Sequence, residues 1–212
     1  MKNNFLEEFD CSTGITNELY VKGDLLVRTS RKADSSYVDN LQKKNSAAVG
    51  FIQKTVWDKY VYGGERNFVV FICEKNNDMV GYVLLTPGKK VGSYAKIQQI
   101  AIQEDARRLE YGTALIETVR KFCNKFGRMG VTLRCRKDLQ SNFFWQALGF
   151  NLYGIWEKGK KNHVNFTASN DIMLWKIELN EKINSLFSPQ QFNYSNEIVM
   201  PEFGERHLFN KI

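Results

Sequence analysis

The chain has 212 residues, of which 43% are hydrophobic and 25% charged, which is enough for one hydrophobic core and argues against a disordered chain. No apolar run approaches the length of about 18 residues that a membrane span needs. Lysine and arginine exceed aspartate and glutamate by 30 to 23, and the net charge of +7 favours phosphate-bearing partners, although solubility alone also accounts for a charge of this size.

The N-terminal part of the chain begins with weak periodicity. Residues 1–23 are expected to form an irregular lead-in without a secretory signal, because MKNNFLEEFD has no apolar stretch. Residues 24–29 predict a strand, and apolar residues at helical spacing predict helices over 32–44 and over about 47–61. The four cysteines lack CxxC spacing, which suggests reduced thiols in a cytoplasm, and with only two histidines no metal site is expected.

The middle of the chain predicts a hairpin and then a strand followed by a helix. The runs 67–74 and 79–86 are rich in β-branched and aromatic residues and flank the turn residues KNND, so the two strands are expected to be antiparallel. A basic loop over 87–93 leads to a buried strand, KIQQIAI, over 96–102. An amphipathic helix then ends near Phe126.

The C-terminal half predicts a strand over 131–136, a helix over about 139–147, and strands over 150–156 and 172–179. The element order βααβββαβαββ predicts an α/β fold with a sheet of mixed strand direction.

The expected domain organisation is a lead-in (1–23), one domain (24–179) and a C-terminal extension (180–212). Aromatic side chains are frequent in the extension, whereas disordered tails are poor in them. We therefore expect the extension to pack on the body or on a second subunit, which would make a homodimer.

The turn between strand 96–102 and the following helix has the features of an anion site. A helix that opens directly after a strand presents unpaired N–H groups and the positive end of its dipole. Arg107 and Arg108 supply charge there, Gly112 allows close approach of the backbone, and Ala114 lacks bulk. A pyrophosphate group suits such a turn.

The order of elements and the run RRLEYGTALIE resemble the GNAT acyltransferases, whose cofactor signature is Arg or Gln, two residues, Gly, one residue, and Gly or Ala. Arg107 stands at the first place and Gly112 at the second glycine, but Glu110 replaces the first glycine. A carboxylate there repels phosphate unless it points outward or pairs with a neighbouring arginine. The alternative is that Glu110 merely favours the helix start and that the loop binds nothing. The resemblance implies a cofactor loop of Arg107, Arg108, Glu110, Tyr111, Gly112, Thr113 and Ala114.

A second segment, DLQSNFFWQALGF, resembles the family's Asn-x-x-Ala-x-x-Phe-Tyr-x-x-x-Gly-Phe, with Asp138 at the Asn. The resemblance spans about 24–179 and implies a GNAT fold, in which helices flank a mixed, mostly antiparallel sheet and CoA lies in a slot between two splayed parallel strands. Acetyl-CoA or another acyl-CoA is then the cofactor. Its implied contacts outside the loop are the backbone of Ile100, Ala101 and Ile102, together with Asp138 and Asn142.

The catalytic positions depart from the family. Acyl transfer needs an uncharged amine and a proton donor for the departing thiolate. The resemblance places a tyrosine donor where this chain has Trp145 and often a glutamate where it has Gln98 or Gln99, but indole is no acid and an amide is no base. We expect the reaction centre at Gln98 and Trp145, with Tyr153 as a nearby phenol.

Other groups remain open as substitutes. Tyr94 is a second candidate phenol, although both tyrosines are more commonly packing or surface residues. Cys135 is a candidate thiol, although a cysteine on an apolar strand usually fills the core. His163 is a loosely placed candidate base.

The missing base suggests an acceptor that is already neutral, such as the exocyclic amine of a nucleobase. The basic loops PGKKVG and EKGKKNH and the many aromatics favour nucleic acid in the same way. The segments KKNSAAVGFIQK, RRLEYG and LRCRKDLQSNFFW also resemble a phage-associated GNAT branch similar to the Mom family of DNA-modifying proteins, which implies adenine in DNA as acceptor. Two alternatives are a protein or small-molecule amine acetyltransferase and a catalytically inactive GNAT-like module that binds nucleic acid or protein.

Overall fold

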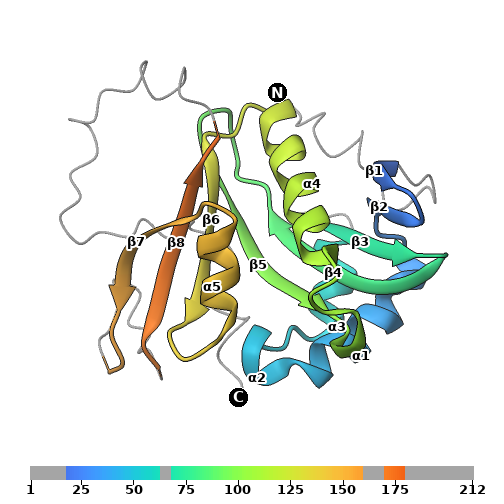
Figure 1. The fold of residues 1–212 in the computed structure, drawn as a ribbon, viewed down its shortest axis with the longest axis horizontal. Helices are drawn as coiled ribbons and strands as arrows, with labels where there is room; N and C mark the ends of the chain where they lie inside the picture. Colours follow the sequence, from blue (N-terminus) through green and yellow to red (C-terminus); the bar gives the residue numbers. More distant parts are fainter. Residues whose placement is uncertain (1–17, 63–67, 160–169, 180–212) are drawn as a thin grey trace.

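The structure is a computed structural model that describes residues 18–62, 68–159 and 170–179. In this part of the chain, eight strands form one sheet in the order β1-β2-β3-β4-β5-β6-β8-β7, and β5–β6 is its one parallel pair (Figure 1). The α/β fold with a mixed, mostly antiparallel sheet flanked by helices is thereby confirmed. The strands are β1 (Glu18–Lys22), β2 (Leu25–Thr29), β3 (Val69–Lys75), β4 (Asp78–Thr86), β5 (Tyr94–Ile102), β6 (Gly130–Arg136), β7 (Asn151–Trp156) and β8 (Ile172–Glu178).

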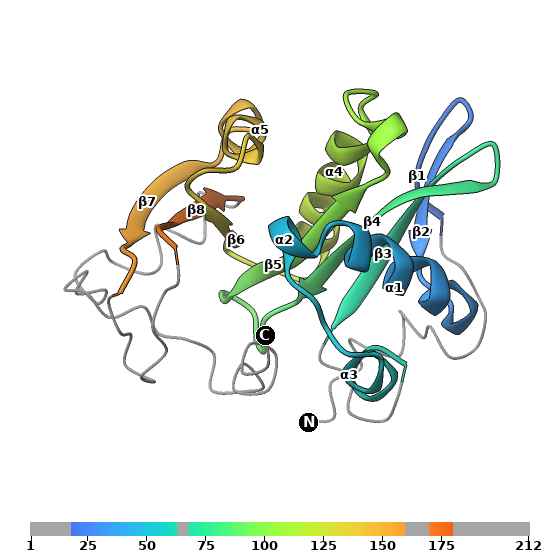
Figure 2. The same ribbon diagram turned by 90° about the horizontal axis from the view of Figure 1, so that it is seen from below.

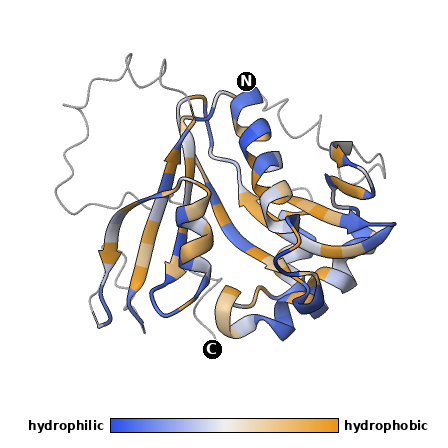
Figure 3. Ribbon diagram, viewed as in Figure 1, coloured by the Kyte–Doolittle hydropathy of each residue, from blue (hydrophilic) through white to orange (hydrophobic). Residues whose placement is uncertain are grey.

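Helices cover both faces of the sheet (Figures 1 and 2). The helices are α1 (Ser35–Lys44), α2 (Ser46–Val49), α3 (Lys54–Tyr60), α4 (Tyr111–Lys125) and α5 (Ser141–Ala147), with 3₁₀ turns at Lys32–Asp34 and Glu104–Ala106. The helix α4 buries one side on the sheet, and its outer side is hydrophilic (Figure 3). No helix in the described ranges is long and apolar enough to cross a membrane.

Two predicted elements differ from the structure. Residues 18–22 were expected to be irregular but form β1, which pairs antiparallel with β2 across a tight turn where Gly23 has φ +62°. The single helix expected over 47–61 is instead α2 and α3, because the chain between them leaves helical geometry at Gly50, whose φ is +75°. That backbone conformation is accessible almost only to glycine.

Two hydrophobic clusters lie on opposite faces of the sheet. One joins α4 and α5 to the sheet, with Phe122 of α4 packing edge-on against Phe71 of β3 at 5.5 Å between ring centroids. The other lies under α1 and α3, where Trp57 packs on Tyr82 at 6.2 Å. The sheet is therefore the middle layer of three.

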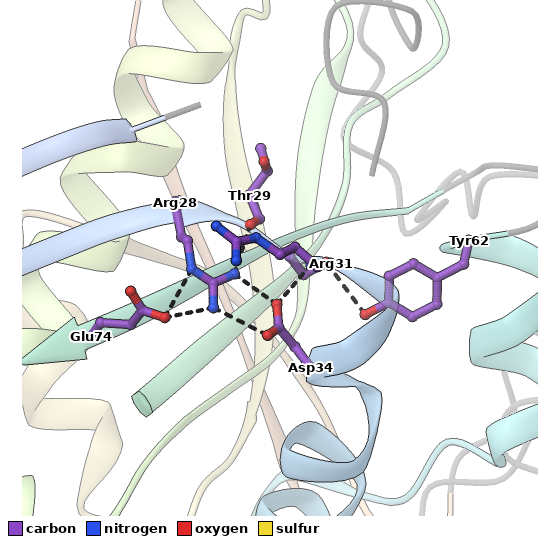
Figure 4. Close-up of polar contacts among 7 residues, drawn as sticks. Arg28, Thr29, Arg31, Asp34, Tyr62 and Glu74 are labelled. Carbon is purple, nitrogen blue, oxygen red and sulfur yellow. Dashed lines mark hydrogen bonds and ion pairs between the residues drawn. The ribbon is translucent and has the colours of Figure 1, made fainter. Parts of the chain in front are cut away.

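A buried ion cluster fixes the start of α1 to the sheet (Figure 4). Arg28 of β2 donates to Asp34 at 2.7 and 3.1 Å through its two Nη atoms, and its Nε donates to Glu74 of β3 at 2.9 Å. Burial alone would lower the pKa of Arg28, but the hydrogen bonds that it donates to these two carboxylates, together with their charges, outweigh burial and raise the pKa. The guanidinium therefore stays charged and joins three elements.

The parallel strands β5 and β6 diverge, as the splayed slot requires. They pair only from Tyr94 with Gly130 to Ile97 with Leu133, and beyond that point each continues to its own end (Figure 1). The register between β4 and β5 also shifts, so that Gln98 is an extra residue in β5. A bulge of this kind re-aims the side chains and backbone groups that follow it.

Candidate functional site

The loop between β5 and α4 has the backbone shape that glycine would give. Arg108 and Glu110 both have positive φ, of 64° and 65°. Such a conformation costs a residue with a side chain roughly 1–2 kcal/mol and is concentrated at functional sites. Because Glu110 occupies the place of the first signature glycine, the loop keeps the geometry of the signature without its residue.

The first turn of α4 offers backbone donors. Helical hydrogen bonding begins with Ala114, whose N–H donates to the Glu110 carbonyl at 3.0 Å. The N–H groups of Tyr111, Gly112 and Thr113 come before it and have no partner within the helix. A Cβ on Gly112 would lie 3.1 Å from Cζ of Phe144, so α5 packs closely on this turn.

The side chains of the loop divide into exposed and buried groups. Arg107, Arg108 and Thr113 are exposed, whereas Tyr111 and Ala114 are buried in the core. Tyr111 can therefore contribute only its backbone N–H, Ala114 contributes no donor because its N–H is bonded within the helix, and the exposed arginines supply charge. A phosphate group fits this donor set.

The carboxylate of Glu110 points toward the β1 edge of the sheet. It accepts a hydrogen bond from Lys22 Nζ at 2.8 Å, and both side chains are exposed. That hydrogen bond lowers the pKa of Glu110 and raises the pKa of Lys22. The charge that threatened phosphate binding is therefore matched by a cation that the sequence pattern did not indicate.

Arg107 reaches away from the helix start. Its Nη2 donates to Asn45 Oδ1 at 2.7 Å, and its Nε donates to the Ile102 carbonyl at 3.4 Å. The predicted pantetheine contacts Ile100, Ala101 and Ile102 lie in the divergent part of β5, which pairs with β4 on one side and has no strand partner in the described residues on the other. The backbone groups on that edge face β6 and suit an extended ligand.

Asn142 and Asp138 are engaged within the protein. Asn142 Nδ2 donates to the carbonyls of Arg136 and Leu139, both at 2.8 Å, and its Oδ1 accepts from Trp175 Nε1 at 3.0 Å. Asp138 pairs with Arg136. Both residues hold the turn between β6 and α5 in shape.

A pocket of about 280 Å³ lies beside this turn, on the side of α5 that faces β8. Its lining includes Phe143, Met173 and Trp175 but no described residue of β5 or of the cofactor loop. It is therefore separate from the diverging strands.

Trp145 is a packing residue in this structure. It is 4% exposed and lies between Phe144 and Phe150, with ring centroids at 4.9 and 5.4 Å. Cys135 lies beneath the same helix, with its Sγ 3.2 Å from Ser141 Oγ. Burial raises the pKa of Cys135, and hydrogen bonds from Ser141 and Trp145 offset this only in part, so a neutral thiol in the core is favoured.

The two glutamines at the β5 bulge bind neighbouring elements. Gln98 Nε2 donates to Thr86 Oγ1 at 2.9 Å. Gln99 accepts from the Tyr82 hydroxyl at 3.0 Å and donates to the carbonyls of Val49 and Gly50 at 3.2 and 3.3 Å. Gln99 therefore joins β5 to α2.

The phenols lie away from Gln98 and Trp145. Tyr153 is on β7, two strands outside β6 and hence about 10 Å from it, because neighbouring strands are about 4.8 Å apart. Tyr94 donates to Glu178 at 2.5 Å at the closed end of the β5–β6 pair. Burial raises the pKa of Tyr153, although Arg134 and Lys176 oppose the rise. His163 lies outside the described residues.

Arginines on β6 face the side of the sheet opposite α5. Side chains alternate along a strand, and Cys135 faces α5, so Arg134 and Arg136 face the other way. Lys176 of β8 pairs with Thr132 and shares that side. We call Arg134, Arg136 and Lys176 the basic face.

Two cations of the basic face lie over aromatic rings. Arg134 Cζ lies 5.6 Å from the ring centroid of Trp156, and Lys176 Nζ lies 6.0 Å from the ring centroid of Tyr153. Distances near 6 Å are typical of cation–π contacts. Sequence reasoning overlooked this face, although the alternation in LRCR indicates it.

Comparisons with known proteins identify the family. The model of the Acetyltransferase (GNAT) family matches residues 31–150, which is more than half of the chain. No curated protein sequence matches this chain.

Solved structures share the fold at low identity. The ribosomal-protein-S18-alanine N-acetyltransferase of Escherichia coli superposes with a TM-score of 0.58 at 16% identity, over 74% of this chain and 94% of that chain. A Salmonella typhimurium acetyl transferase that modifies the N-terminal serine of ribosomal protein L7/L12 gives 0.63 at 14%, over 77% and 100%. A GNAT family acetyltransferase of Elizabethkingia anophelis with acetyl-CoA bound gives 0.56 at 17%, over 74% and 100%. This protein belongs to the GNAT acetyltransferase family.

Proposed function

We propose that this N-acetyltransferase uses acetyl-CoA to acetylate the exocyclic amine of a nucleobase, with adenine in DNA as the first candidate. The amine nitrogen forms the bond to the acetyl carbon, the C–S bond breaks, and the nitrogen's proton leaves with the thiolate as CoA thiol. The protein must bind the cofactor, orient the acyl group and present the acceptor.

The cofactor is assigned to the loop and the edge of β5. The N–H groups of Tyr111, Gly112 and Thr113 would bind the pyrophosphate, with Arg107 and Arg108 adding charge. The divergent edge of β5, at Ile100 to Ile102, would bind the pantetheine arm through its backbone.

The absence of a carboxylate at Gln98 and Gln99 supports a neutral acceptor. A lysine amine is mostly protonated at neutral pH and needs a base before it can attack, whereas a nucleobase amine is already neutral. Gln98 and Trp145 would then shape the reaction centre rather than exchange protons with it. Tyr153 is proposed to contact the acceptor and not the acyl group.

The single observation that carries the acceptor class is the pairing of cations with rings on the basic face. Arg134 with Trp156 combines charge for phosphate with a flat surface for a base, and Lys176, which also pairs with Glu178 at 3.1 Å, lies over the ring of Tyr153. The likeness of KKNSAAVGFIQK, RRLEYG and LRCRKDLQSNFFW to the phage-associated Mom-like branch supports the same acceptor.

A protein α-amine is the second candidate. The structures from E. coli and S. typhimurium are named for acetylation of ribosomal proteins. An α-amino group has a pKa near 8, so a useful fraction is neutral without a strand carboxylate. A binding module without catalysis is the third candidate, since Trp145 and Glu110 both depart from the family pattern.

Mass spectrometry of nucleosides distinguishes these candidates. DNA from cells that express the protein is expected to contain a base heavier by one acetyl group, and DNA from cells that express the Gly112→Asp variant is not. An unmodified nucleoside profile together with newly acetylated protein N-termini would instead identify the second candidate. If neither the nucleosides nor the protein N-termini are acetylated and the protein still binds DNA in a salt-sensitive way, the third candidate, the binding module, is identified.

Two further proposals concern the location and the oligomeric state of the enzyme. We propose a cytoplasmic location, from the reduced thiols that the cysteine pattern predicts. We also propose homodimerisation through the extension 180–212, which lies outside the described residues.

A further inference from the structure

A short segment spans the ends of the diverging strands. The strap, defined here as Asn45–Gly50, comprises the residue that ends α1, the four-residue helix α2 and Gly50. None of the residues of α2 is buried. In Figures 1 and 2, α2 lies beside the end of β5, on the side toward α5 and β6.

Three polar side chains hold the strap, and each comes from an element of the site. Arg107 of the cofactor loop donates to Asn45 Oδ1 at 2.7 Å. Arg136, at the end of β6, donates to the Ala47 carbonyl at 2.8 Å. Gln99, in β5, donates to the carbonyls of Val49 and Gly50. The strap therefore bridges both arms of the divergence by hydrogen bonds, and Val49 alone of its residues packs against the core under α1 and α3.

The Arg107 link is the one that cofactor binding would break. Asn45 offers a neutral amide oxygen, whereas a phosphate offers charged oxygens that can accept two parallel hydrogen bonds from one guanidinium. Arg107 has one further contact, a long one of 3.4 Å to the Ile102 carbonyl, whereas Arg136 also pairs with the Asp138 carboxylate and Gln99 also accepts from the Tyr82 hydroxyl at 3.0 Å. Gly50, with φ +75°, provides a hinge at the far end of the strap.

We propose that the strap covers the acceptor side of the divergence until acyl-CoA binds, and that Arg107 then leaves Asn45 for the pyrophosphate and releases the strap at that end. The proposal rests on the cofactor assignment made above. Arg107 is thus a positioning residue for the strap as well as a cofactor contact.

Hydrogen exchange at the strap tests the proposal. The N–H groups of Ala48 and Val49 donate to the Asn45 carbonyl, and that of Gly50 to the Ser46 carbonyl, so all three report on the strap. Saturation of the wild-type chain with coenzyme A is expected to speed their exchange by roughly threefold or more, because a released segment opens more often.

Two variants test the hydrogen bond from Arg107 to Asn45 without removing the cap of α1. Asn45 also caps α1 through Nδ2 to the Leu41 carbonyl, so we leave it in place and change its partner. Arg107→Met without coenzyme A is expected to match the strap exchange of the saturated wild type. Arg108→Met, the same change at the adjacent exposed arginine, is expected to keep the slow exchange of the free wild type.

Unchanged strap exchange on saturation with coenzyme A, or equal strap exchange in Arg107→Met and Arg108→Met, would overturn the proposal. Failure of the wild type to bind coenzyme A by calorimetry is a separate result, which overturns the cofactor assignment and the strap's role with it.

Discussion

At the scale of single residues, Glu110 is the most informative departure from the family pattern. Its backbone adopts the left-handed conformation of a glycine, and its carboxylate pairs with Lys22. The loop therefore keeps a backbone shape that glycine favours, and the charge that Glu110 adds is paired. The sequence indicated the conflict at Glu110, but Lys22 is 88 residues away and no local pattern connects the two.

Loss of the Lys22–Glu110 ion pair is expected to lower the affinity for acetyl-CoA. Lys22→Met leaves the Glu110 carboxylate unbalanced near the phosphates, so acetyl-CoA is expected to bind roughly threefold more weakly at low salt, the size of a screened interaction over several ångströms. Isothermal titration calorimetry measures the change. Adding Glu110→Gly to Lys22→Met should restore binding, and Lys121→Met, which removes a cation that lies on the Tyr20 ring, should leave it unchanged. Wild-type affinity in Lys22→Met would show that the pair plays no part in binding.

The buried thiols are expected to lower the free energy of unfolding at alkaline pH. Burial raises the pKa of Cys73 and of Cys123 to about 12 each, from 9.0. Above pH 9 the unfolded chain loses these protons while the folded chain keeps them, so the unfolded state binds fewer protons and the free energy of unfolding falls as pH rises. The fall is expected to approach about 1.4 kcal/mol per pH unit for each thiol between pH 9 and 12.

Urea denaturation at pH 8, 9, 10 and 11 measures this slope. A variant with Cys73→Ala and Cys123→Ala serves as the comparison, because it starts less stable but should lose less stability per pH unit. Equal slopes in the two proteins would show that the thiols do not titrate as expected.

At the scale of elements, the ion cluster around Arg28 predicts the stability of α1 on the sheet. Arg28→Met leaves Asp34 and Glu74 buried without their cation, which is expected to cost about 3–5 kcal/mol of unfolding free energy. Chemical denaturation measures the loss. Lys43→Met breaks the exposed pair with Asp39 on the same helix and should cost less than about 1 kcal/mol. Similar losses in the two variants would contradict the assigned role of the cluster.

The sequence predicts most elements because their signals are local. The β3–β4 hairpin follows from two apolar runs around KNND, and α4 follows from helical spacing after a buried strand. The short strand β1 gives too few residues for a pattern, and the break at Gly50 depends on one glycine in a helical context. Both misses lie where a single glycine determines the backbone.

At the scale of the whole molecule, the order of strands decides which residues meet. The sequence predicts Tyr153 as a phenol near the reaction centre at Gln98 and Trp145. In the sheet β8 enters between β6 and β7, so Tyr153 lies two strands out. Such an insertion leaves no local signal, whereas the divergence of β5 and β6 was predictable from the family resemblance.

The central claim is that the start of α4 holds the pyrophosphate of acetyl-CoA, and calorimetric titration of acetyl-CoA tests it most directly. The wild type is expected to bind, and Gly112→Asp to bind at least about tenfold more weakly, because it adds a negative charge and bulk beside the N–H groups assigned to the phosphates. Gly112→Ala adds only the Cβ near Phe144 and separates crowding from charge. No binding by the wild type, or equal binding by wild type and Gly112→Asp, would contradict the account.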